Sequence, residues 1–146
     1  MKKLLILVLC ISFGCANKQK ELQYLICKDS IQYWNYEWSR KRAEYFGFTF
    51  RFDKNGKIKK YSYSKVKNKR WEFWDIQDPD INKWSVTKDS IFKIMGDKEK
   101  IIRYTEDTIY TISLKYKTKS YYVRVKEDLN IEKTPRSDSA DMFQSR

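Results

Sequence analysis

The sequence contains no histidine, so the commonest general base and the commonest transition-metal ligand are both missing. No Ser-His or Cys-His pair can form, and the sequence has no Gly-rich phosphate-binding loop. We therefore expect a protein that is not an enzyme and that holds no metal and no cofactor. A hydrolase would need a cleft with paired carboxylates of perturbed pKa, and no pair of Asp or Glu residues stands out for that role.

Three acidic residues lie close together in the sequence at Asp75, Asp78 and Asp80. Oxygen ligands at short spacing can hold Ca²⁺, but this spacing does not match an EF-hand loop. An ordinary solvated turn is the favoured interpretation.

Glycine and proline are also scarce, at 4 and 2 residues, which argues against a low-complexity or disordered chain. The length of 146 residues suits one domain, and an aromatic content of 16% can supply its core. The net charge is +12, with the lysines spread along the whole chain. Such a balance indicates either anionic partners or simply a well-solvated surface.

The first fifteen residues have the layout of an export signal. A basic start, Met1 to Lys3, precedes the apolar residues 4–11, and Ser12-Phe13-Gly14-Cys15 follows. The apolar run is too short to span a bilayer. The sequence resembles a bacterial lipoprotein signal, which implies removal of residues 1–14 and a lipid on Cys15. A plain signal peptide cut elsewhere, or an uncleaved apolar start, is the alternative.

This resemblance implies an outer-membrane protein anchored through the lipid on Cys15, with its domain on the periplasmic or cell-surface side. Residues 15–29 would then be the lipidated Cys and a polar tether. Cys27 would be the remaining thiol, either buried and inert or free for an intermolecular bond. Basic and aromatic residues alternate between Lys59 and Trp71, which would suit single-stranded nucleic acid, but an exported protein rarely meets any. We expect no nucleic-acid partner.

The rest of the chain reads as β-strands joined by tight turns. Residues 46–52 alternate four Phe with Gly, Thr and Arg, and Asn55-Gly56 is a strong hairpin signal. Between Trp84 and Leu114 the turn Thr-x-Asp-Ser/Thr occurs twice, each time followed by an Ile-rich strand. Connections this short require antiparallel neighbours. The sequence predicts an all-β, antiparallel up-and-down meander of about eight strands, without a convincing amphipathic helix.

The order of the Phe-rich strand, the Asp-x-Asn-Gly hairpin and the two Thr-x-Asp turns is similar to lipocalin-like lipoproteins of Gram-negative bacteria. The resemblance covers about residues 30–126 and implies that the meander closes into a small lipocalin-like barrel. Residues 127–146 have little apolar content and predict a disordered tail.

The aromatic residues of the meander are candidates either for the lining of a ligand cavity or for a packed core. The residues expected to face inward are Phe48, Phe50, Trp71, Trp74, Trp84, Phe92 and Tyr110. An open cavity of about 300 Å³ or more would favour a binding or accessory protein for a small apolar ligand. A filled interior would favour a module that binds another envelope protein, such as an immunity or hydrolase-inhibitor lipoprotein, through its basic surface.

Overall fold

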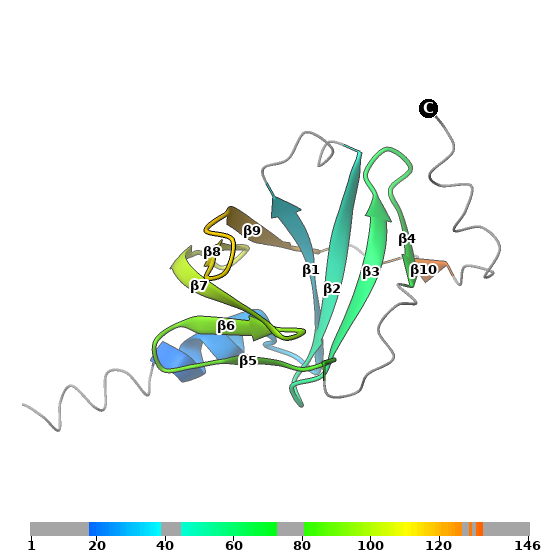
Figure 1. Ribbon diagram of the computed structural model, residues 1–146. Helices are drawn as coiled ribbons and strands as arrows, with labels where there is room; N and C mark the ends of the chain where they lie inside the picture. Colours follow the sequence, from blue (N-terminus) through cyan, green and yellow to red (C-terminus); the bar gives the residue numbers. More distant parts are fainter. Residues whose placement is uncertain (1–17, 39–44, 73–80, 127–128, 130, 133–146) are drawn as a thin grey trace, which may run out of the picture.

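The computed structural model describes residues 18–38, 45–72, 81–126, 129 and 131–132. Within these residues a single sheet contains ten strands and a short helix covers residues 18–26 (Figure 1). The strands are β1 Ile31–Trp38, β2 Phe46–Asp53, β3 Ile58–Ser64, β4 Lys69–Glu72, β5 Trp84–Val86, β6 Ile91–Ile94, β7 Asp97–Tyr104, β8 Thr108–Ser113, β9 Lys119–Arg124 and β10 Ile131–Glu132.

The sheet confirms the predicted all-β antiparallel meander. Its strand order is β10-β4-β3-β2-β1-β9-β8-β7-β6-β5, so β1–β4 and β5–β9 are two runs of sequential neighbours joined where β9 pairs with β1. The sheet curls into a half-barrel (Figure 1). Lys83, immediately before β5, forms an isolated antiparallel bridge with Lys57 in the β2–β3 turn.

The polar turns form as their side chains predict. Thr87 Oγ1 accepts a hydrogen bond from the Ile91 backbone N–H at 3.2 Å, and Thr105 Oγ1 accepts one from Thr108 N–H at 3.1 Å. In the β2–β3 turn, Gly56 has φ of +86° and its N–H donates to Asp53 O at 2.9 Å. Glycine suits this position because a Cβ disfavours positive φ.

Residues 15–29 are expected to be a polar tether, but the structure has a helix over residues 18–26. This part of the expectation is wrong. Leu22 and Ile26 are fully buried in the core, and Leu25 packs against it. At the end of the helix, Arg124 Nη2 donates to Leu25 O at 2.7 Å and Trp34 Nε1 donates to Ile26 O at 2.8 Å. These bonds satisfy carbonyls that a helix end leaves without an intrahelical donor. The spacing of Leu22, Leu25 and Ile26 is that of an apolar helix face.

The strand count and the tail also differ from expectation. The described residues hold ten strands where about eight are predicted. The additional strand β10 lies within residues 127–146 and pairs in parallel with β4, so a disordered tail is the wrong description for Ile131 and Glu132. The predicted signal at residues 1–14, Cys15 and the three-carboxylate turn lie outside the described residues.

Candidate binding site

The inward side of the half-barrel is filled by aromatic rings at the end nearest the helix. Trp34, Phe52 and Phe92 are at most 1% exposed. Phe92 lies 5.6 Å from Phe52 and 5.5 Å from Tyr122, measured between ring centroids. Leu22 and Ile26 of the helix belong to the same cluster. This part of the interior is a packed core.

The predicted inward-facing residues do not all lie together. Phe50, Trp84 and Phe92 are in the buried core, and strand register puts Phe48 and Trp71 on the same side of the sheet, where both are half-buried. Tyr110 is expected to face inward, and this expectation is wrong. It lies on the outward side, opposite Tyr121, with the two ring centroids 6.0 Å apart. Trp74 lies outside the described residues.

A buried carboxyl group, Glu99 on β7, faces the interior with a set of hydroxyl groups. Its Oε2 accepts hydrogen bonds from Thr111 Oγ1 at 2.6 Å and from Tyr122 Oη at 3.1 Å. Ser120 Oγ lies 2.9 Å from Thr111 Oγ1 and extends the network. Desolvation raises the pKa of Glu99 above its ordinary value, although the hydrogen bonds from Thr111 and Tyr122 act in the opposite direction.

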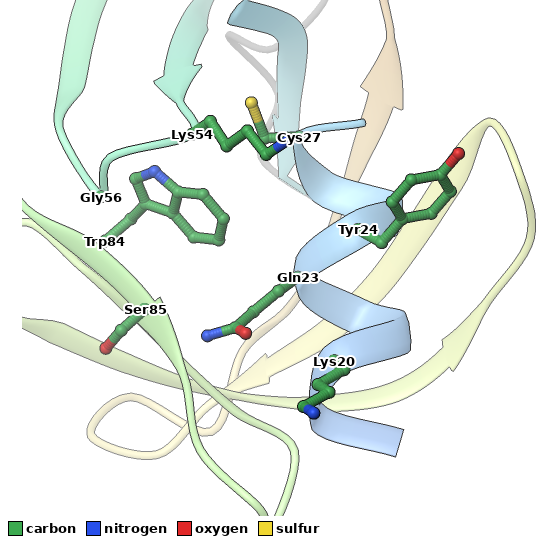
Figure 2. Close-up of a pocket in the computed structure, with 8 residues that line it drawn as sticks. All are labelled: Lys20, Gln23, Tyr24, Cys27, Lys54, Gly56, Trp84 and Ser85. Carbon is green, nitrogen blue, oxygen red and sulfur yellow. The ribbon is translucent and has the colours of Figure 1, made fainter. Parts of the chain in front are cut away.

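A pocket of about 310 Å³ lies between the helix, the β2–β3 turn and β5 (Figure 2). The helix contributes three residues, Cys27 follows the helix, and the turn and β5 contribute two each; the lining comprises Lys20, Gln23, Tyr24, Cys27, Lys54, Gly56, Trp84 and Ser85. In Figure 2 the Trp84 indole occupies the middle of the site and Gln23 extends toward β5. The volume is at the lower end of the range for small-molecule sites.

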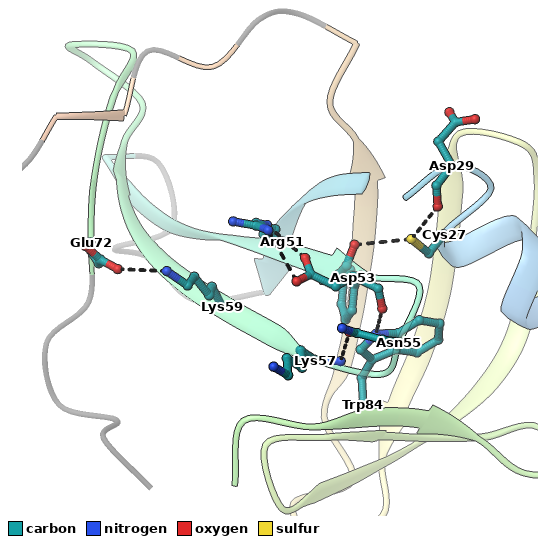
Figure 3. Close-up of polar contacts among 10 residues, drawn as sticks. Cys27, Asp29, Arg51, Asp53, Asn55, Lys57, Lys59, Glu72 and Trp84 are labelled. Carbon is teal, nitrogen blue, oxygen red and sulfur yellow. Dashed lines mark hydrogen bonds and ion pairs between the residues drawn. The ribbon is translucent and has the colours of Figure 1, made fainter. Parts of the chain in front are cut away.

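Hydrogen bonds to the end of β2 fix two walls of this pocket (Figure 3). Trp84 Nε1 donates to Asp53 O at 2.9 Å, which holds the indole against the turn. Cys27 Sγ donates to Phe52 O and to Asp29 O, both at 3.2 Å, which ties the end of the helix to the same strand. The pocket is therefore largely pre-formed.

The charges at the pocket are positive. Of the described residues that line it, Lys20 and Lys54 carry charge. The neighbouring Asp53 carboxylate is engaged by Arg51, whose Nε donates to Asp53 Oδ1 at 2.8 Å (Figure 3). A pocket lined by two lysines and an indole ring suits a ligand that joins an anionic group to an apolar part.

The Cys27 thiol is buried, which agrees with the first of its two predicted states, a buried inert side chain rather than a thiol free for an intermolecular bond. Burial and the nearby Asp53 and Asp29 carboxylates raise its pKa, so the reactive thiolate is disfavoured. The site accordingly offers groups for binding rather than an activated nucleophile.

Sequence reasoning missed Lys20 and Gln23 because it treated residues 15–29 as a tether, and it missed Lys54 because it assigned that residue only to a hairpin turn. The signal that could have found the helix is the apolar spacing from Leu22 to Ile26. No local pattern could have found the site itself, since its walls come from residues 20–27, 54–56 and 84–85.

Comparison with known proteins gives no match: no family model, no curated protein and no solved structure is significantly similar to this chain. The lipoprotein and lipocalin-like resemblances stay predictions. Among the described residues, no helix is long and apolar enough to cross a bilayer.

Proposed function

We propose that this chain is a lipid-anchored protein of the outer membrane that binds a small anionic amphiphile and is not an enzyme. The observation that supports this is the pre-formed pocket, whose lining includes the Lys20 and Lys54 side chains and the Trp84 indole. Because the interior near the helix is packed, the ligand site proposed is this pocket at the rim and not the centre of a barrel.

The position of the helix relative to Cys15 is consistent with a ligand from the membrane surface. The helix is present by residue 18, and three residues of chain reach at most about 10 Å. A lipid on Cys15 would therefore hold the pocket close to the head groups. The domain would lie on the periplasmic or cell-surface side of the bilayer.

A protein-interaction module is the second candidate, and the filled interior favours it. Core rings such as Phe52 and Phe92 leave no room between them for a ligand. Both functions can reside in one chain, because the pocket and the outward side of the sheet are separate surfaces.

Titration with octyl phosphate, octanol and inorganic phosphate, followed by calorimetry and native mass spectrometry, tests the pocket. We expect octyl phosphate to bind more tightly than either octanol or phosphate. Changing Lys20→Gln together with Lys54→Gln should weaken octyl phosphate binding by about tenfold or more, since charge-assisted contacts contribute about 1.5–3 kcal/mol each.

The matched control is Lys28→Gln with Lys67→Gln, which removes the same charge from two exposed lysines outside the pocket lining. This control should bind octyl phosphate like the unchanged chain. Equal weakening in both double variants would mean that overall charge, not the pocket, attracts the ligand. Failure of all three probes to bind would end the proposal.

A further inference from the structure

The outward side of β6–β9 carries several positive charges and no carboxylate. Register places five cationic residues there, and we call this surface the basic face: Lys93, Lys98, Lys100, Arg103 and Lys119. The acidic residues of the same strands, Asp97 and Glu99, pair opposite Ile94 and Phe92 on the inward side. In strands β6–β9 the two signs of charge are thus on opposite sides of the sheet.

An arginine and two aromatic rings form one end of the basic face, in the row of the register farthest from Lys93 and Lys98. The Arg103 guanidinium carbon lies 4.2 Å from the centroid of the Tyr110 ring. Tyr110 in turn lies beside Tyr121, which is 41% exposed, with the two rings tilted by 34°. Tyrosine and arginine are enriched at the centres of protein interfaces, where they contribute most of the binding energy.

The lysines of the basic face repel one another in the isolated chain. Lys93 is directly opposite Lys98 in the β6–β7 ladder, an arrangement that destabilises a sheet. Within the described residues no carboxylate forms an ion pair with Lys93, Lys98 or Lys119. The Asp107 carboxylate, in the turn beside this face, already pairs with Lys126 at 2.7 Å. A negatively charged partner would relieve this repulsion.

We propose that the basic face is a docking surface for an acidic protein, with carboxylates meeting the lysines and the partner's surface packing on the adjoining Arg103–Tyr110–Tyr121 stack. The stack runs across β7, β8 and β9 in one row of the register, and its tyrosine and arginine side chains are of the types enriched where folded proteins meet. The half-buried Ile91 and Ile112 lie in the row beside this stack and add apolar area. This interaction is independent of the pocket and of any ligand there.

A photo-crosslinking amino acid at position 121, introduced into the full chain in the cells that produce it, tests the docking surface. The matched control is the same amino acid at position 45, because Tyr45 is also an exposed tyrosine, at 55%, and lies immediately before β2, away from the basic face. We expect a crosslink to one protein from position 121 and none from position 45. A crosslink from position 121 to lipid alone, equal crosslinking from both positions, or no crosslink would overturn the proposal.

The crosslinked protein is then purified, and its affinity is measured for three forms of the chain. Lys93→Gln with Lys98→Gln should weaken binding by about tenfold or more, and binding should weaken as salt increases. Lys28→Gln with Lys67→Gln, an equal loss of charge at exposed positions off the face, should bind like the unchanged chain. Unaltered affinity in the Lys93 and Lys98 variant would overturn the proposal.

Flotation with vesicles of equimolar phosphatidylglycerol and phosphatidylcholine tests whether the basic face binds anionic lipid instead of a protein. The experiment uses a Cys15→Ser chain, which would have no lipid of its own. We expect the Lys93 and Lys98 variant to float to the same extent as the Lys28 and Lys67 variant. A loss of flotation confined to the Lys93 and Lys98 variant would show that the face binds anionic lipid and would contradict the protein partner.

Discussion

Among the single residues, Glu99 stands out because its carboxyl group is buried in the inward face of the sheet. It is 7% exposed, and its hydrogen bonds come from the neutral hydroxyl groups of Thr111 and Tyr122. Asp97, on the same strand, adds a like charge that further raises the pKa of Glu99. Burying a charge without a cation costs stability, and the hydroxyl groups offset this cost in part.

We expect the Glu99→Gln variant to gain stability relative to the unchanged chain as pH rises. The folded-state pKa of Glu99 lies above its unfolded value near 4.5, so the folded state binds more protons between these two values. The contribution of Glu99 to stability is therefore fully present below about pH 4.5 and is lost as pH rises through the folded-state pKa. Urea unfolding at a series of pH values measures this difference.

The control for this prediction is Glu106→Gln, which removes the same charge from an exposed turn. Its urea midpoint should run parallel to that of the unchanged chain from acid to neutral pH. If the urea midpoint of Glu99→Gln also runs parallel to that of the unchanged chain at every pH, the pKa of Glu99 does not differ between the folded and unfolded states. That result would contradict the prediction.

Among the elements, the helix over residues 18–26 contributes side chains both to the core and to the pocket. Its inward residues Leu22 and Ile26 complete the aromatic cluster, while Lys20, Gln23 and Tyr24 form one wall of the pocket. The bonds from Trp34 and Arg124 to its last carbonyls tie it to β1 and β9. The helix is therefore an integral part of the domain rather than a spacer.

The Leu22→Ala variant should lose about 2–5 kcal/mol of unfolding free energy, since the side chain is fully buried in a packed cluster. Tyr24→Ala on the same helix is the comparison, because Tyr24 is 59% exposed and its removal should change stability by about 0.5 kcal/mol or less. Denaturant unfolding gives both values. Equal, small effects would mean that the helix does not pack on the sheet.

For the whole molecule, attachment to a membrane depends on the proposed lipid at Cys15. Each buried methylene contributes about 0.8 kcal/mol to attachment, so a chain with several acyl groups would be held permanently. With the helix following so closely, the pocket would remain at the bilayer surface, and the basic face would be available to a partner in the same compartment.

The Cys15→Ser variant should therefore move from the membrane fraction to the soluble fraction, and the unchanged chain should incorporate labelled palmitate. Cell fractionation followed by immunoblotting measures the first effect. Cys27→Ser is the control, because Cys27 is buried and its replacement should leave the chain in the membrane. Persistence of Cys15→Ser in the membrane fraction would contradict the anchor.

The sequence by itself determined the strands and most of their turns. The alternating Phe of β2 share one face, and along it Phe50 and Phe52 reach the core while Phe46 is exposed. The Thr residues of the polar turns bond backbone groups only a few positions away. These interactions are local, so a short window of sequence contains all the groups involved.

Only the tertiary structure decided which face of β8 is inward and where a pocket forms. Ile109 and Ile112 fall on opposite sides of that strand, so alternation does not choose between them. Packing of Ile109 in the core decides it and turns Tyr110 outward. The pocket likewise needs the helix, the β2–β3 turn and Trp84 to meet, and contacts between such distant segments have no counterpart in local periodicity.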